Sequence, residues 1–241
     1  MRTKFKLALL LVAFLLSAAV VTKIAANSEY DWKMVRDEDG IQVYLKSFWA
    51  DDIKSFRGII HINSSVDSIL AAILDINACS EWVHRCKKPL LLAQISFSES
   101  YHYQIHKLPF PAQNREFIFH SKVTRSPQTG SVSIHMNAEP EFCQDNAHLC
   151  SLIPETNLVR VEHSHGHYLL EPIDKKKTRV TWTHHTNPGG NLPIWLINSL
   201  VKEMPYRTLQ GLRKKVFNSK YQQSKLVINS EGHIINMITV K

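Results

Sequence analysis

The chain has 241 residues, of which 44% are hydrophobic, with 8 glycines and 10 prolines. This composition fits one globular domain, with or without tails, that is long enough to bury a sizeable core. The formal net charge is +8, but four cations lie in the first 26 residues, which contain no acid. The remainder is only mildly basic, which argues against a nucleic-acid-binding protein and is compatible with contact to anionic membrane surfaces.

The first 26 residues are typical of an export signal. Cations at positions 2, 4 and 6 precede an apolar run over residues 7–21, and the small residues Ala25-Ala26 follow. The run is shorter than the roughly 20 residues of a membrane-spanning helix. We therefore expect a signal peptide over residues 1–26 and an exported protein, periplasmic or secreted. The alternative is an uncleaved anchor that keeps the protein at a membrane.

The next segment is predicted to mix short strands and helices. We expect a short helix over residues 31–39, a turn at Asp39-Gly40 and strands over residues 41–48 and 53–62. Ser65 is a candidate N-cap. It leads into a predicted helix over residues 69–76, and a second short helix is predicted over residues 79–85.

From residue 89 the pattern changes to the two-residue alternation of half-buried strands. We predict strands over residues 89–97, 100–108, 116–125, 130–138, 158–173 and 178–186, the last two forming a hairpin. A long helix over residues 191–216 follows. Because it is the only long helix expected to cover the apolar face of this antiparallel sheet, the sheet must curve around it. The fold class is therefore α+β.

The long helix changes character along its length. Its second half carries one apolar stripe at helical spacing: Val201, Pro205, Leu209, Leu212 and Val216. Its first half is apolar nearly all round, which is typical of a helix that covers something apolar. We expect this half to act as a lid over a hydrophobic cavity. Residues 218–241 form a C-terminal extension, with a small hairpin around residues 229–232.

The four cysteines fall into two local pairs, and export permits disulfides. We expect a bridge between Cys143 and Cys150, because the residues between them are typical of a loop. The redox state of Cys79 and Cys86 is left open. The sequence contains no Cys-x-x-Cys spacing, which would have indicated a zinc site.

Four segments in chain order carry a family resemblance. Residues 108–117 (LPFPAQNREF) form a proline-rich turn followed by Arg115-Glu116-Phe117. Residues 159–168, residues 177–182 (KTRVTW) and residues 192–198 (LPIWLIN) come after it. Over about residues 30–217, the chain resembles the START lipid-transfer domain in its bacterial exported form, within the helix-grip superfamily. Glu116 stands where the family pattern has Asp.

The resemblance implies a helix-grip fold, in which a curved antiparallel sheet wraps the C-terminal helix and leaves an internal hydrophobic cavity. It also implies a non-catalytic protein that binds and carries one phospholipid, sterol or related apolar molecule. We expect a monomer with a lipid ligand, transient contact with a membrane surface, no nucleic-acid partner and no cofactor.

The predicted cavity wall comes from the inward strand faces and the lid. Its members are Phe117, Phe119, Val132, Ile134, Met136, Trp195 and Leu196. The alternative for each is plain core packing, because a cavity wall and a core share the same chemistry.

Three residues are candidates for a polar anchor in this cavity. Arg115 offers a fork of donors to a lipid phosphate or carboxylate; alternatively, it fixes the turn through an ion pair with Glu116 or another acid. His102 and Ser121 match the positions at which sterol-carrying members place an acid and a base. Because His102 and Ser121 differ from this acid and base, the sequence argues against a sterol hydroxyl held by an ion pair.

Two other function classes stay open. An enzyme on the same fold needs an ionisable group in the cavity, for which His102 and Arg115 are the candidates. A metal-binding protein would use histidines of the 158–186 hairpin, where His163, His165 and His167 share one strand face and His165 is expected opposite His184.

Overall fold

The computed structural model describes residues 32–48, 51–154 and 158–239. The chain divides into two units, residues 1–33 and the compact unit Met34–Lys241. The expected signal or anchor over residues 1–26 lies outside the described residues. Everything below concerns the second unit and the two residues before it.

The second unit is built on a 10-stranded sheet. All neighbours with a described register are antiparallel except β8, which runs parallel to β6. The order across the sheet is β1 (Lys33–Glu38), β2 (Ile41–Phe48), β3 (Asp51–Ile62), β10 (Lys177–Asn187), β9 (His163–Asp174), β7 (Val132–Ala138), β6 (Arg115–Arg125), β5 (Glu99–His106) and β4 (Cys86–Ser96), with β8 (Val159–Arg160) beside β6.

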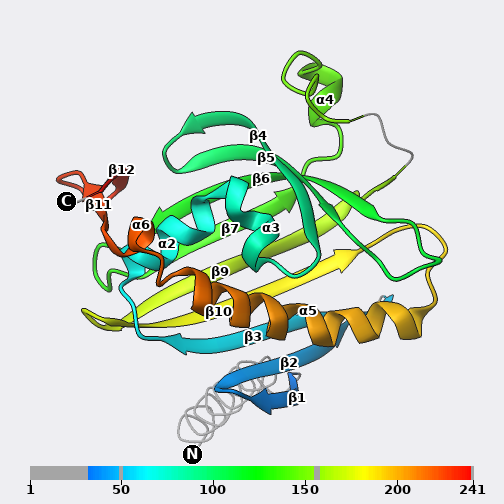
Figure 1. Cartoon of the computed structure of the whole chain (residues 1–241), viewed down its shortest axis with the longest axis horizontal. Coiled ribbons are helices and arrows are strands. Elements are labelled where there is room, and N and C mark those ends of the chain that lie inside the picture. Colours follow the sequence, from blue (N-terminus) through cyan, green and yellow to red (C-terminus); the bar gives the residue numbers. More distant parts are fainter. Residues whose placement is uncertain (1–31, 49–50, 155–157, 240–241) are drawn as a thin grey trace, which may run out of the picture. The chain divides into compact units, whose positions relative to one another are not determined.

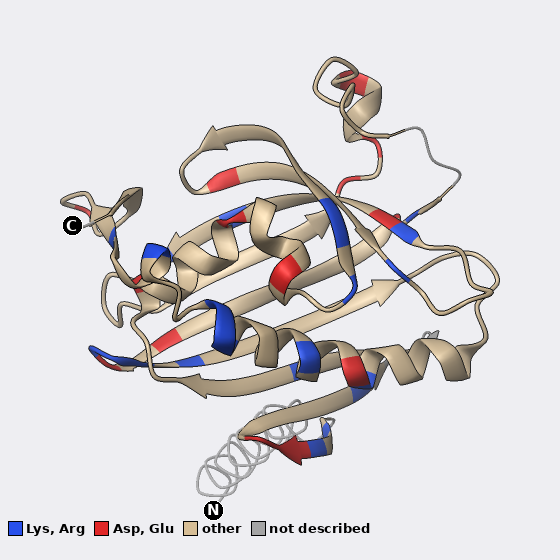
Figure 2. Ribbon diagram, in the orientation of Figure 1, with Lys and Arg blue, Asp and Glu red and all other residues tan. Residues whose placement is uncertain are grey.

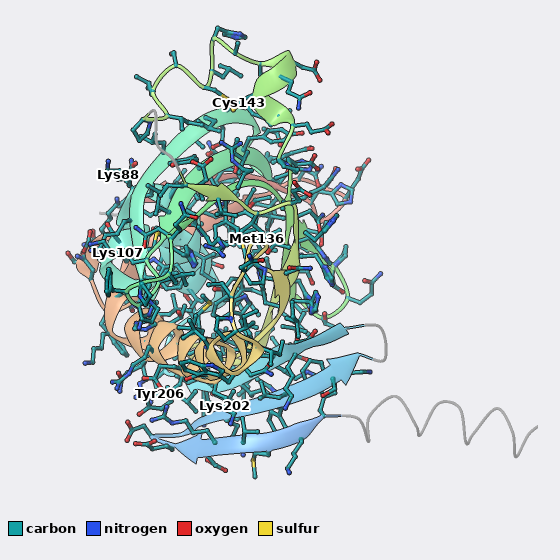
Figure 3. The ribbon with its side chains drawn as sticks, turned by 90° about the vertical axis from the view of Figure 1, so that its right-hand side faces the viewer. Lys88, Lys107, Met136, Cys143, Lys202 and Tyr206 are labelled. Carbon is teal, nitrogen blue, oxygen red and sulfur yellow. A yellow bond between two sulfur atoms is a disulfide. The ribbon has the colours of Figure 1, made fainter. Side chains whose placement is uncertain are left out.

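One long helix packs on the inner face of this sheet. It is α5 (Ile194–Lys215), and the end-on view shows the sheet curving around it (Figure 3). The shorter helices are α2 (Val66–Leu74), η1 (Ile76–Ala78), α3 (Cys79–Trp82), α4 (Phe142–Asp145) and α6 (Ser219–Gln222). Figure 1 shows α2 and α3 beside α5 over the same face of the sheet. The predicted α+β class and the curved sheet around a C-terminal helix are confirmed.

The C-terminal half of α5 holds the helix on the sheet. Its predicted stripe is buried at Pro205, Leu209 and Leu212, and at Val216 directly after the helix. Gly58 of β3 allows this contact, because a Cβ at that position would lie 2.7 Å from a methyl carbon of Leu209. Burial of each leucine contributes roughly 2 kcal/mol.

Several local predictions are borne out. The Asp39-Gly40 turn joins β1 to β2, with both residues at positive φ, as a tight hairpin turn requires. The Ser65 side chain caps α2 by accepting a hydrogen bond from the Ser68 amide at 3.2 Å. Beyond α5, β11 (Ser224–Ile228) and β12 (Ile234–Thr239) form the expected small hairpin.

The helix expected over residues 31–39 is wrong: this segment contains the edge strand β1. β1 is mostly exposed and has no continuous buried face, so its sequence lacks the alternation that identifies inner strands. The prediction missed that the Asp39-Gly40 turn would fold the segment back onto β2.

Both cysteine pairs form disulfides. The expected Cys143–Cys150 bridge closes the loop around α4, and Cys79–Cys86 links the start of α3 to the start of β4. The second bridge ties a helix that packs on α5 to the wall of the sheet, near the cavity described next.

Candidate functional site

A cavity lies between the inner face of the sheet and the N-terminal half of α5. The volume of this cavity is about 150 Å³. Its wall includes side chains from β3, β5, β6, β7, β9 and β10, from the α2–α3 segment and from α5. Charged residues are scarce along the middle of these strands and gather toward strand ends, turns and α5 (Figure 2).

The lid face of α5 follows helical spacing. Ile197, Leu200, Val201 and Met204 line the cavity, and Leu192 adds to the wall just before the helix begins. These four helix positions follow the i, i+3, i+4, i+7 pattern, so they lie on one face of α5.

Four of the seven predicted wall residues line the cavity: Phe117, Phe119, Ile134 and Met136. The rings of Phe117 and Phe119 stack, with centroids 5.1 Å apart. Figure 3 shows Met136 in the space between the strands and α5. These residues come from β6 and β7, which are neighbours in the sheet and both have alternating sequences.

Val132, Trp195 and Leu196 do not line the cavity. Val132 is completely buried but lies across from Leu170 in the closed core, at the start of β7 and two residues before Ile134. Trp195 is 69% exposed, because it lies two residues before Ile197 and so about 200° around the helix. Leu196 lies about 100° from Ile197, at the side of the lid. An apolar half-helix does not reveal its inward face from composition alone.

Strand β5 lines the cavity with an entirely polar face. Ser100, His102, Gln104 and His106 all contribute to the wall and are all buried. The apolar residues of the strand lie at the alternate positions. Tyr103 and Ile105 pack into a separate cluster with the α4 loop, which contains the Cys143–Cys150 bridge. The disulfide loop therefore covers the apolar side of β5, and the polar side faces the cavity.

Three histidines of the wall are neutral at pH 7. Burial lowers the pKa of both His102 and His106 to about 4. Burial, assisted by neighbouring histidines, lowers the pKa of His184 to about 3. The Gln104 side-chain amide lies 2.9 Å from Nε2 of His106, so this ring nitrogen takes part in a hydrogen bond within the wall.

Some polar atoms of this wall have no hydrogen-bond partner among the described residues. They are Nδ1 of His102, Nδ1 of His106, Nδ1 of His184 and Oγ of Ser121. His184 is partly satisfied, because its Nε2 lies 2.9 Å from Oγ of Ser164. A buried polar group without a partner typically costs about 1–3 kcal/mol, so His102, His106 and Ser121 call for an explanation.

Arg115 lies in the wall but is held by backbone carbonyls. Its Nε donates to the Pro188 oxygen at 2.5 Å, Nη1 to Gln113 at 2.6 Å and Nη2 to Gly189 at 2.7 Å. The guanidinium therefore joins the loop before β6 to the loop before α5. The expected partner Glu116 points elsewhere, to the Tyr103 hydroxyl at 2.9 Å and to Arg160 at 2.8 Å.

The predicted histidine cluster is divided between the two faces of the sheet. His165 lies opposite His185 rather than His184, and their ring centroids are 5.4 Å apart. His184 lies opposite Gly166 and lines the cavity. The part of the chain that the structure describes contains no group of three or more His, Cys, Asp or Glu residues placed to hold a metal ion. Within the same ranges, no helix has the length and hydrophobicity needed to cross a membrane.

Comparison with known proteins agrees with this architecture. The chain matches the START domain model over residues 14–221, and it belongs to the START domain family. An uncharacterized protein of Pseudomonas aeruginosa is 34% identical over 197 residues, which cover 81% of this chain and 92% of that protein. The phosphatidylcholine transfer protein of Rattus norvegicus is 24% identical over 174 residues, covering 71% and 77%.

Solved structures show the same fold. The crystal structure of a STAR-related lipid transfer protein fragment from Xanthomonas axonopodis superimposes with a TM-score of 0.68 and 27% identity, covering 78% of this chain and 99% of that one. Human StAR-related lipid transfer protein 5 superimposes with a TM-score of 0.65 and 19% identity, covering 85% and 96%. The helix-grip architecture expected from the sequence is thus confirmed.

Proposed function

We propose that this protein binds one lipid, or a related apolar molecule, in the cavity under α5 and carries it between membranes without catalysis. The proposal rests on one observation: a member of the START domain family has a cavity with a largely apolar wall, one side of which is the lid face of α5. Relatives named as lipid transfer proteins support the same activity in general. Burial of acyl chains would supply the affinity, at about 0.8 kcal/mol per CH₂ group.

The end of the molecule near the start of α5 is the proposed contact with the membrane. Trp195 is 69% exposed, Ile194 is 41% exposed and Phe110, in the loop before β6, is 97% exposed. Arg115 ties this loop to the one preceding α5. Exposed aromatic and aliphatic side chains of this kind partition into a bilayer interface. Opening of the N-terminal half of α5 there would let a lipid enter.

The proposal extends to cellular location and domain layout. Residues 1–26 would direct export or anchor the chain, residues 30–217 would form the lipid-binding domain, and residues 218–241 would be an extension. Both disulfides are consistent with an exported protein. We propose that it acts as a monomer outside the cytoplasm.

An enzyme on this fold is the second candidate, because His102 and Arg115 both line the cavity. Neither is well suited to catalysis. A base with a pKa of about 4 is weak at neutral pH, and the Arg115 guanidinium is already engaged by three carbonyls. Carriage without chemistry is therefore the better supported activity.

Blocking the cavity tests the proposal. Delipidated protein is incubated with phosphatidylcholine vesicles, separated from them and analysed by native mass spectrometry; transfer to acceptor vesicles is measured in parallel. Wild type should carry one lipid per chain. Leu200→Trp, which places a larger ring on the lid face, should reduce loading at least several-fold. Lys202→Trp is the matched control at an exposed position of the same helix, away from both the cavity and the proposed membrane contact, and should load normally.

Two results would contradict this function. One is wild-type protein that takes up no lipid from any vesicle. The other is a Leu200→Trp variant that folds and loads as well as the control.

A further inference from the structure

The polar face of β5 is a feature that a container for hydrocarbon does not need. In most half-buried strands the apolar residues face the interior. In β5 the cavity receives Ser100, His102, Gln104 and His106, while Tyr103 and Ile105 face the other way. The wall opposite, on α5, is apolar. The cavity therefore has one hydrogen-bonding side and one hydrocarbon side.

The centre of this polar side is the His102–Ser121 region. His102 pairs with Phe119 across β5 and β6, and Ser121 pairs with Ser100, so His102 and Ser121 are diagonal neighbours on the inward face. Both side chains are at least 95% buried. Neither Nδ1 of His102 nor Oγ of Ser121 has a partner among the described residues. A ligand group that exchanges hydrogen bonds with them would remove this penalty.

The wall offers little compensation for a charged headgroup. The His102 and His106 rings are neutral, and a neutral imidazole carries one donor and one acceptor nitrogen but no net charge. Arg115 is committed to backbone carbonyls, and the Asp75 carboxylate to Lys220 at 2.7 Å and the Tyr221 hydroxyl at 2.8 Å. Lys54 of β3 also lines the cavity and is only partly buried. Because this ammonium group could attract a phosphate, any test of headgroup selection has to include it.

From this arrangement we infer that the cavity selects an uncharged lipid bearing a hydroxyl or carbonyl group, which hydrogen-bonds to His102 and Ser121, over lipids with charged headgroups. This rests on the proposed lipid-binding function and specifies its ligand class. The hydrocarbon part of such a lipid lies against the α5 face. Its neutral polar group lies against β5.

Competition between matched lipids tests the inference. Delipidated full-length protein is incubated with dioleoylphosphatidylcholine vesicles that contain equal small amounts of dioleoylglycerol and dioleoylphosphatidic acid, which differ only by the phosphate. Protein-bound lipid is then quantified by mass spectrometry against vesicle composition. The expected result is enrichment of dioleoylglycerol over both charged lipids. The double variant His102→Phe with Ser121→Ala should lose about 2- to 10-fold of that enrichment per hydrogen bond removed.

Three variants keep the test falsifiable. Ser121→Ala alone removes one oxygen and should fold even if the double variant does not. His165→Phe, on the exposed outer face of β9, is the matched control and should retain wild-type selectivity. In Lys54→Gln, which removes a cation of the cavity wall, the enrichment of dioleoylglycerol over dioleoylphosphatidic acid should persist.

The outcomes separate the inference from the function. Enrichment of phosphatidic acid or phosphatidylcholine, above all if lost in Lys54→Gln, overturns the inference while lipid binding stands. The inference is also overturned if wild type loads all lipids equally and neither Ser121→Ala nor the double variant changes that loading. Absence of any bound lipid overturns the proposed function too.

Discussion

At the scale of single residues, the Arg115 guanidinium is a group that could bind a ligand but holds two loops together instead. The sequence offers a guanidinium next to a proline-rich turn, which suits either an anionic ligand or a structural contact. In the fold its donors reach carbonyl oxygens of Pro188 and Gly189 on one side and Gln113 on the other. The positive φ of Gly189 and Gly190 allows the chain to turn closely over the guanidinium. Arg115 thus fixes where the lid helix starts.

Replacement of Arg115 tests this structural role. Arg115→Met keeps the bulk of the side chain but leaves three carbonyls without their charged donor, and each such bond contributes about 1.5–3 kcal/mol. After partial compensation by water, we expect a loss of about 2–4 kcal/mol in unfolding free energy, measured by urea denaturation. The exposed Arg179→Met on β10 is the control and should stay within about 0.5 kcal/mol of wild type. An Arg115→Met variant of unchanged stability would contradict the role.

The candidate site was only partly predictable from its residues. Strand alternation identified Phe117, Phe119, Ile134 and Met136, because period two separates the faces of a strand without ambiguity. The same alternation places four polar residues on one face of β5, but of these only His102 was predicted as a site residue. Tyr103 and Ile105 would normally mark the inward face, and only the fold reveals the α4 loop that covers them instead. The inward direction of a strand depends on what covers each side, which its own sequence does not state.

At the scale of elements, α5 has two contacts with different functions. Its N-terminal half covers the cavity, and its C-terminal half is fixed between β3 and α3. Gly211 makes the second contact close, since a Cβ there would lie 2.2 Å from the carbonyl oxygen of Trp82. The α3 segment is in turn tied to β4 by the Cys79–Cys86 bridge. The long helix was predictable within a few residues, but not this close approach, for which an isolated glycine inside a helix is the only signal.

Substitution of Gly211 should therefore reverse the usual effect of helix propensity. Alanine in a helix is normally favoured over glycine by about 1 kcal/mol. In Gly211→Ala the added methyl meets backbone of α3, which a rotamer change cannot relieve, so we expect a net loss of about 1–3 kcal/mol. Thermal unfolding measures the change. Lys214→Ala, at an exposed position of the same helix, should be neutral or slightly stabilising. A Gly211→Ala variant more stable than wild type would show that α3 and α5 are further apart.

At the scale of the whole molecule, the cavity competes with stability. A domain of this kind is stable by only about 5–15 kcal/mol, while its interior accommodates unpartnered polar atoms beside an unfilled space. A bound lipid would restore packing and hydrogen bonds, and it would stabilise the folded state by mass action. The closed core around α2, the start of β7 and the Tyr221 side chain supplies packing that does not depend on a ligand. The proposed ligand site and the closed core that stabilises the fold thus lie side by side in one interior.

The buried histidines make the stability of the whole fold depend on pH. His102, His106 and His184 have folded-state pKa values of about 4, 4 and 3, whereas an unfolded histidine titrates near 6.5. Between these values the unfolded state binds more protons than the folded state, so stability falls as pH is lowered from about 6.5 toward 4. Above pH 7 these groups contribute no pH dependence.

Comparing urea unfolding at pH 7.5 and 5.5 isolates this effect, because ordinary carboxylates remain ionised at both values. Linkage gives a loss of about 1 kcal/mol for each buried histidine over this interval. His102→Phe should therefore lose about 1 kcal/mol less than wild type between the two pH values. His165→Phe on the outer face serves as control for the loss of a histidine as such. An unchanged pH dependence in His102→Phe would mean that the ring is accessible to protons in the native state, and hence that this end of the cavity is open to water rather than closed by the lid.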